Sequence, residues 1–158
     1  MFLQTAKFAE RVILMSETVK KDFELFAPEY AHKARVVKNV SYIPESIYKS
    51  DPKQVLELYH LPEKFIYLPT QFWKHKNHEV VFKAIQILKK TNIKIILVCS
   101  GYPGDHRHAT YFTNLFSEIS ELDIRNQIIY LGMIPHEHVL MLMRQSICVI
   151  NPSLFEGW

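Results

Sequence analysis

Two lysines stand between an apolar run and the start of a predicted helix. Lys74 and Lys76 belong to the segment Thr70-Gln-Phe-Trp-Lys-His-Lys-Asn-His78, which follows the apolar residues 65–68. Free N–H groups and the dipole at a helix N-terminus favour anions, and an ammonium adds a point charge for a phosphate. The segment is also compatible with a solvated basic turn whose Trp73 packs on a neighbouring domain. Residue types alone leave both interpretations open.

Glu156 is the second candidate for chemistry. It stands between Phe155 and Gly157-Trp158, after a predicted strand and a Pro-Ser turn. A carboxylate at the ligand-binding end of a strand can accept hydrogen bonds from hydroxyl groups, as the ribose-binding acid does in dinucleotide folds. Alternatively, Glu156 is an acid at a helix N-terminus that complements the helix dipole.

Composition excludes several other kinds of site. The chain has 19 Lys and Arg against 16 Asp and Glu, a formal charge of +3, without the dense basic face of a nucleic-acid-binding domain. No nucleic-acid partner is therefore predicted. No stretch reaches the roughly 18 apolar residues needed to span a bilayer. The four glycines cannot be spaced into a GxxxxGK[ST] or GxGxxG phosphate motif; they are Gly101, Gly104, Gly132 and Gly157.

Histidines and cysteines give no metal signal. Neither HExxH, CxxC nor DxD accompanies the close histidine pairs, so no metal site is predicted. Cys99 and Cys148 both lie in apolar runs and are predicted to be small buried hydrophobic residues. This use of cysteine is typical of a reducing, cytoplasmic setting. The histidine pairs are His75 and His78, His106 and His108, and His136 and His138.

Short apolar runs alternate with amphipathic stretches along the chain. This alternation predicts an α/β fold, a Rossmann-like parallel sheet with helices on both faces. The helix over 77–90 carries apolar residues at helical spacing, namely Val81, Ala84, Ile85 and Leu88. The predicted strands cover residues 11–15, 34–41, 65–68, 93–99, 127–131 and 147–150, and the other helices residues 16–26, about 112–122 and 136–145, with a further start at Ser50-Asp51-Pro52.

The carboxyl ends of parallel strands meet at one edge of a sheet, where ligands bind. Four predicted loops lie at such ends, and together they contain every glycine of the chain. Glycine there indicates that the backbone must approach something closely. These loops are residues 70–76, 100–105, 132–135 and 152–158.

The segment Asn151-Pro-Ser-Leu-Phe-Glu-Gly-Trp158 resembles the PSxxEGFG segment of retaining glycosyltransferases of the GT-B type, family 4 (glycosyl transferases group 1). Four other segments agree with that family in order and spacing. The resemblance implies a GT-B fold that is incomplete over this chain. The other segments are Phe8–Ser16, Val37-Lys-Asn39, Lys76-Asn77 and Leu131–Pro135.

The same resemblance implies a domain division. Residues 1–44 would be the C-terminal tail of an N-terminal acceptor domain. Residues 45–62, which end at a break marked by Pro62, would be an interdomain linker with a short helix. Residues 63–158 would be a truncated nucleotide-sugar donor-binding domain.

The family's site residues carry over position by position. Lys76 and Glu156 would be catalytic: Lys76 would hold the donor diphosphate, and Glu156 would contact the transferred sugar. The position of the family's usual arginine is Gln71 here, and Lys74 is a candidate to supply that charge. The residues implied to bind substrate are Gln71, Lys74, Gly101, Gly132, Met133, Ile134, Phe155 and Gly157.

The parent protein is therefore expected to be a hexosyltransferase, with mannosyl transfer among the options. It would act with retention, without metal or cofactor, on a nucleotide-diphosphate sugar and a glycan or lipid-linked acceptor. Polysaccharide biosynthesis in the cytoplasm, with peripheral membrane association, fits that role. The chain alone is expected to be inactive, because the family's second glutamate would lie beyond Trp158. The alternatives are a non-catalytic nucleotide-binding module and a protein-interaction module.

Overall fold

The computed structural model describes residues 2–156. The chain divides into two compact units. One consists of residues 2–43 with residues 155–156, and the other of residues 44–154.

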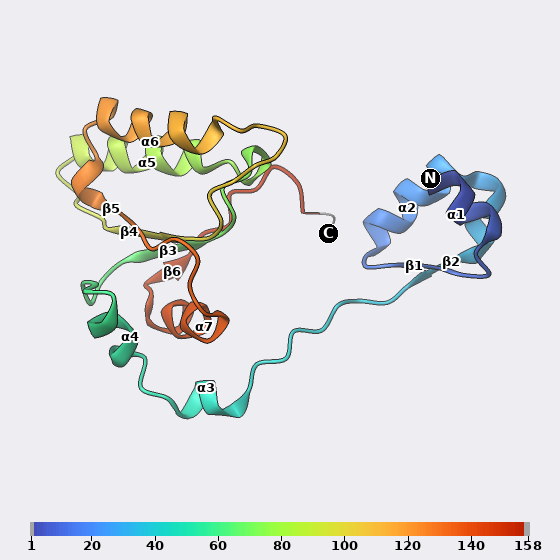
Figure 1. Ribbon diagram of the computed structural model, residues 1–158, viewed down its shortest axis with the longest axis horizontal. Coiled ribbons are helices and arrows are strands. Elements are labelled where there is room, and N and C mark those ends of the chain that lie inside the picture. The colour runs from blue at the N-terminus through green and yellow to red at the C-terminus, as the bar shows by residue number, and fades with distance from the viewer. Residues whose placement is uncertain (1, 157–158) are drawn as a thin grey trace. The chain divides into compact units, whose positions relative to one another are not determined.

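The first unit contains a two-stranded parallel sheet with helices around it (Figure 1). Strands β1 (Val12–Leu14) and β2 (Ala34–Val36) pair in parallel, with Val12 opposite Ala34. The predicted strand 34–41 is shorter than expected because its partner ends at Leu14, whose carbonyl accepts the last bond, from Val37. The helices are α1 (Phe2–Phe8), α2 (Glu17–Phe26) and the 3-10 helix η1 (Pro28–Lys33).

The second unit is built on a sheet of four parallel strands in the order β5-β4-β3-β6 within the described residues. Ile66 of the inner strand β3 is level with Leu97 of β4 and with Cys148 of β6. The strands are β3 (Ile66–Pro69), β4 (Leu97–Ser100), β5 (Ile128–Tyr130) and β6 (Cys148–Val149).

Helices cover both faces of this sheet, as the sequence predicts (Figure 1). On one face α5 (His78–Lys90) and α6 (Tyr111–Glu121) pack on the strands around the buried Phe82 and Ile119. On the other face α4 (Lys53–Leu58) and α7 (His136–Gln145) enclose a second core that includes Tyr67 and Leu142. Fully buried strands such as β4 are what a sheet covered on both sides requires.

The segment 45–62 belongs to the second unit. It carries a helix that the sequence did not reveal, α3 (Glu45–Lys49), before α4. Asp51 Oδ1 accepts the backbone N–H of Lys53 at 2.9 Å, which explains why α4 begins there. Arg144 of α7 donates to the carbonyls of Ile47 and Ser50, and so fastens α3 to the rest of the unit.

The two cysteines differ in environment. Cys99 is completely buried in β4, as predicted, and burial raises the pKa of its thiol. Cys148 is exposed, so the prediction that it is buried is wrong. Its strand β6 lies at the end of the sheet order, paired in the described chain with β3 alone. Both cysteines are free thiols.

Candidate functional site

The loops that follow the four strands of the second unit meet at one edge of the sheet. Phe72 N donates to the Tyr102 carbonyl at 2.9 Å, and Gly101 N donates to the Gly132 carbonyl at 2.8 Å. Leu154 N, from the segment after β6, donates to the His75 carbonyl at 2.9 Å. The convergence that the sequence predicts is therefore made by backbone hydrogen bonds between loops.

A pocket of about 190 Å³ opens at this edge, and we name it the edge pocket. Four of the residues predicted to bind substrate line it together: Gln71, Gly101, Met133 and Ile134. Gly132 adjoins them through its carbonyl, which accepts from Gly101. The other lining residues are Pro69, Thr70, Ser100, Tyr102 and Val139.

Gly101 is the position at which the pocket wall requires glycine. Its φ is +145°, and a Cβ there would lie 2.2 Å from the Thr70 carbonyl oxygen. Tyr130 fixes the same peptide, because its hydroxyl donates to the Gly101 carbonyl at 2.8 Å. The wall therefore requires a residue without a side chain at this position, because the backbone after β4 lies directly against the backbone after β3.

Two buried aromatic side chains, Phe72 and His78, anchor the segment after β3. Phe72 is completely buried and stacks on the imidazole of His78, with 4.2 Å between ring centroids. His78 Nε2 lies 3.1 Å from Thr70 Oγ1. Burial, with the nearby charge of Lys76, lowers the pKa of His78 to about 4. His78 is therefore a neutral residue at pH 7, and its contacts with Phe72 and Thr70 are structural.

Lys76 is half-buried at the end of the 3-10 turn η2 (Lys74–Lys76). Asn77 follows with φ 55° and ψ 45°, and its side chain does not cap α5, although asparagine is among the residues preferred at that position. Instead Asn77 Nδ2 donates to the Pro152 carbonyl at 3.2 Å. The residue therefore ties the lysine segment to the segment after β6, because the left-handed backbone turns its amide away from the helix.

A family model described as Glycosyl transferases group 1 matches residues 50–158. The chain belongs to this family. No protein of curated function matches the sequence. The similar solved structures include a glycosyltransferase from Rickettsia africae ESF-5, at 20% identity and TM-score 0.70, with 96% of this chain and 42% of that chain covered.

Two further structures extend the comparison. Anabaena Alr3699/HepE in complex with UDP and glucose is 18% identical with TM-score 0.73, covering 97% of this chain and 40% of that one. Sucrose-phosphate synthase from Thermosynechococcus elongatus is 15% identical with TM-score 0.72, covering 99% and 38%. This group 1 glycosyltransferase chain thus has an α/β, Rossmann-like fold of the GT-B type. It spans about two fifths of the length of the structures it matches.

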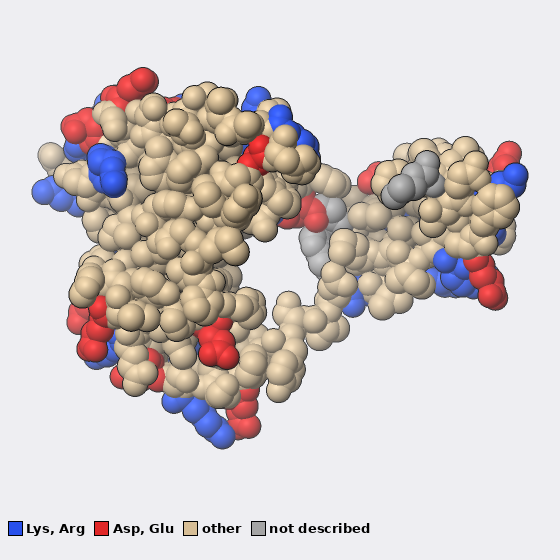
Figure 2. All heavy atoms as spheres, viewed as in Figure 1, with Lys and Arg blue, Asp and Glu red and all other residues tan. Residues whose placement is uncertain are grey.

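Lys74 of this glycosyltransferase chain lies apart from Gln71. It lines a different pocket, of about 370 Å³, which we name the cation pocket. Figure 2 shows Lys and Arg side chains gathered at this end of the second unit, over η2 and the loop after β4. The lining residues are Lys74, His75, Arg107, His108 and Leu154.

Sequence reasoning missed Arg107, which lines the cation pocket, and Asp105, which holds the two loops that carry Lys74 and Arg107. Asp105 is 3% exposed and accepts the backbone N–H groups of Lys74 at 3.1 Å and of Arg107 at 3.0 Å. Burial opposes its ionisation, but these bonds and the Arg107 charge lower its pKa to about 2. The available signal was that Asp105 ends a loop already assigned to the ligand edge, residues 100–105, and that an arginine follows two residues later.

Phe155 and Glu156 are exposed and group with the first unit, so they are described apart from Lys76. Gly157, predicted to offer its backbone N–H to substrate, lies outside the described residues. Over residues 2–156, no three His, Cys, Asp or Glu side chains are placed to share a metal ion. Over the same range, no helix is both long and apolar enough to cross a membrane.

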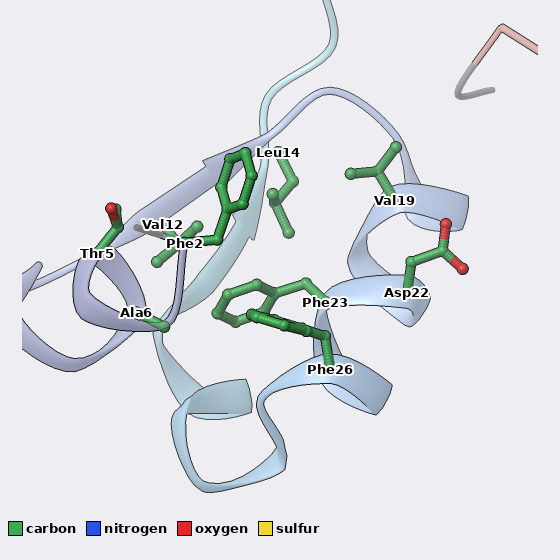
Figure 3. Close-up of a pocket in the computed structure, with 9 residues that line it drawn as sticks. All are labelled: Phe2, Thr5, Ala6, Val12, Leu14, Val19, Asp22, Phe23 and Phe26. Carbon is green, nitrogen blue, oxygen red and sulfur yellow. The ribbon is translucent and has the colours of Figure 1, made fainter.

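The first unit has a pocket of its own, of about 360 Å³. Figure 3 shows Phe23 and Phe26 projecting from α2 into the space beside α1 and the two strands. Asp22 is the charged residue among those that line it. Such walls can bury apolar surface but offer no cation for a diphosphate.

Proposed function

We propose that the whole protein transfers a sugar from a nucleotide-diphosphate sugar to an acceptor hydroxyl, and that the edge pocket receives the donor. The edge pocket carries this proposal: a group 1 glycosyltransferase chain gathers Gln71, Gly101, Met133 and Ile134 at the carboxyl edge of a parallel sheet. Ligands of open α/β sheets bind at that edge. The Alr3699/HepE structure, which has the same fold, holds UDP and glucose.

The chemistry asked of the chain is stabilisation of a leaving group. Breaking the bond between the sugar and the diphosphate leaves negative charge on the diphosphate and an electron-poor anomeric carbon. Lys76, at the end of η2 beside the start of α5, would offset that negative charge. Such cations can replace a metal ion, so we propose transfer that is metal-independent and needs no cofactor.

The remaining roles follow the family pattern. Residues 132–134 would lie along the nucleotide base, and Glu156 would contact the transferred sugar beside Phe155 and Gly157. We assign retention of anomeric configuration, a hexosyl donor with mannose among the options, and a glycan or lipid-linked acceptor. Polysaccharide biosynthesis in the cytoplasm, with peripheral membrane association, completes the proposal.

Donor binding is tested first on the 158-residue chain. Thermal unfolding is followed with and without UDP, GDP and ADP, because a ligand that binds only the native state raises the melting temperature. We expect one nucleotide to stabilise the parent chain clearly more than the Lys76→Ala variant. Lys94→Ala, which removes an exposed lysine before β4, is the matched control and should respond like the parent. If no nucleotide changes the melting temperature, a protein-interaction module becomes the favoured interpretation of this chain.

Transfer itself is tested on the whole protein. Lys76→Ala should lower kcat/KM by an amount equivalent to ~1.5–3 kcal/mol of activation free energy, the scale of a hydrogen bond to a charged group. Glu156→Gln should also lower kcat/KM. If transfer is retaining, NMR of the product should show the anomeric configuration of the donor. If transfer is metal-independent, EDTA should leave the rate unchanged. Nucleotide binding without sugar transfer, and without any effect of Glu156→Gln, would instead identify a non-catalytic binding module.

A further inference from the structure

The cation pocket is separate from the edge pocket. The two share no lining residue. Val139 of α7 borders the edge pocket, whereas the cation pocket adjoins a region lined by residues of α5 and α6. The two pockets therefore have separate linings on different sides of the same sheet edge.

The walls of the cation pocket are held in place before any ligand arrives. The buried carboxylate of Asp105 accepts backbone N–H groups from the loop after β3 and from its own loop, through Lys74 and Arg107. Trp73 Nε1 donates to the Gly104 carbonyl at 3.1 Å, and this bond fixes the indole between the two loops. The pocket is thus assembled by contacts that bridge more than 30 residues of sequence, not by an isolated flexible loop.

Arg107 is positioned by three neighbours. Its Nε lies 3.5 Å from Asp105 Oδ1, and its guanidinium carbon lies 5.8 Å from the centre of the Trp73 ring. Its Nη2 lies 3.4 Å from His75 Nδ1. An imidazole that accepts at Nδ1 carries its neutral-state proton on Nε2, which remains a donor for an anion. The guanidinium is half-exposed, with 52% of its side chain accessible, so it can meet a ligand.

Positive charge in this pocket exceeds negative charge. Arg107 is partly balanced by Asp105, but Lys74 has no carboxylate within salt-bridge distance in the described part of the chain. No Asp or Glu lines the cation pocket. Two permanent cations and two imidazoles around one space are complementary to a phosphate group.

The adjoining region has the opposite character. It has a volume of about 270 Å³, and it shares Lys74 and His108 with the cation pocket. Glu79, Asn114 and Glu118 supply acceptors and an amide there. Carboxylates beside a phosphate site would repel a second phosphate but accept hydrogen bonds from hydroxyl groups.

We propose that the cation pocket and this adjoining region form one binding site for a small phosphorylated sugar or polyol. The phosphate lies among Lys74, His75, Arg107 and His108, and the hydroxyl groups lie against Glu79, Asn114 and Glu118. The site is additional to the donor site, and its occupancy does not require that the chain transfers sugar.

Isothermal titration of the 158-residue chain tests the site with glucose 6-phosphate, inorganic phosphate and glucose as separate ligands. Glucose 6-phosphate should bind more tightly than inorganic phosphate, and glucose should bind least. Saturating UDP should leave the affinity for glucose 6-phosphate unchanged. Absence of glucose 6-phosphate binding at millimolar concentration would overturn the proposal. Displacement by UDP would overturn it as well, because the pocket would then belong to the donor diphosphate.

Two pairs of variants separate the halves of the site. His108→Glu should weaken both phosphate-bearing ligands at least about tenfold by placing a carboxylate in the pocket. His106→Glu makes the same charge change in the same loop outside the lining, and should weaken them less than about threefold because screening reduces its effect. Both histidines are exposed, so neither change disturbs the core. Equal effects of the two variants would overturn the phosphate site.

The second pair lies on α6. Asn114→Ala should weaken glucose 6-phosphate binding but leave inorganic phosphate binding unchanged, since Asn114 lines the adjoining region and not the cation pocket. Thr113→Ala, at the preceding exposed position outside that lining, should affect neither ligand. If Asn114→Ala leaves glucose 6-phosphate binding intact, the hydroxyl-binding half of the proposal is wrong.

Discussion

At the scale of single residues, two glycines in the strand-end loops have different reasons to be glycine. Gly101 has φ +145° and a carbonyl oxygen 2.2 Å from where its Cβ would lie, whereas Gly132 has φ +70° and open space around it. The first position excludes a side chain by contact as well as by backbone angle. The second opposes one by backbone angle alone.

The two glycines therefore predict unequal losses. Gly132→Ala should lower the free energy of unfolding by about 1 kcal/mol, the cost of a left-handed backbone for alanine. Gly101→Ala should cost more than roughly 3 kcal/mol, because β3 and β4 must also separate. Urea unfolding of both variants measures the difference. Similar urea midpoints for the two variants would show that the backbone at Thr70 moves away from the new Cβ at little cost in free energy.

His78 predicts a pH dependence. Its pKa is about 4 in the folded chain against an ordinary value of 6.5. Between pH 4 and pH 6.5 the imidazole is therefore protonated in the unfolded chain but not in the native one. The contribution of His78 to the free energy of unfolding is thus fully present above pH 6.5. It falls by about 3 kcal/mol in total as the pH decreases to 4, and it does not change further below pH 4.

The measurement compares the chain with its His78→Gln variant, because acidic residues titrate in both. Urea unfolding between pH 7.5 and pH 4 should show the steeper decline in the parent chain. Parallel declines would mean that the pKa of His78 is the same in the native and unfolded chains, and that burial does not lower it.

At the scale of elements, spacing predicted helices better than strand ends. α7 covers the predicted residues 136–145, and α5 begins one residue after the predicted start. Within α5, Val81 and Ile85 are buried as expected, but Ala84 is exposed and Phe82 is buried in its place. Burial of an alanine side chain gains little hydrophobic free energy, whereas burial of a phenylalanine gains much more. Phe82 therefore has the larger influence on which face of α5 packs on the sheet.

Strand ends depend on partners that sequence patterns do not reveal. The predicted strand 93–99 pairs only from Leu97, because its partner strands begin at Ile66 and Ile128; before that point the Ile95 carbonyl accepts from the Gln127 side-chain Nε2 at 2.9 Å. The candidate site shows the same division. Its loops follow from the alternation of strands and helices. The bond from Lys74 N to Asp105 and the close approach at Gly101 arise from tertiary contact, and no local pattern encodes them.

The docking of α3 gives the element-scale prediction. Arg144→Met keeps the side-chain stem but removes the donors to the carbonyls of Ile47 and Ser50. The loss should be about 1 kcal/mol, with faster amide hydrogen exchange over residues 45–50. Arg11→Met, which removes one local bond to the Glu10 carbonyl, is the control and should leave that exchange unchanged. Unaltered exchange in Arg144→Met would mean that Ile47 alone holds the helix.

At the scale of the whole molecule, the division into two units predicts where a protease cuts first. Residues 37–43 form no helix or strand, and Val40 and Tyr42 are 90% and 82% exposed. A short chymotrypsin digest should cut after Tyr42 before it cuts within residues 44–154, because cleavage needs an extended, accessible backbone. The larger product should keep a cooperative thermal transition, since both cores around its sheet lie wholly within residues 44–154. First cuts inside α5 or α7 would contradict the predicted order of cleavage. A product that melts without cooperativity would show that the second unit depends on residues 2–43 for its stability.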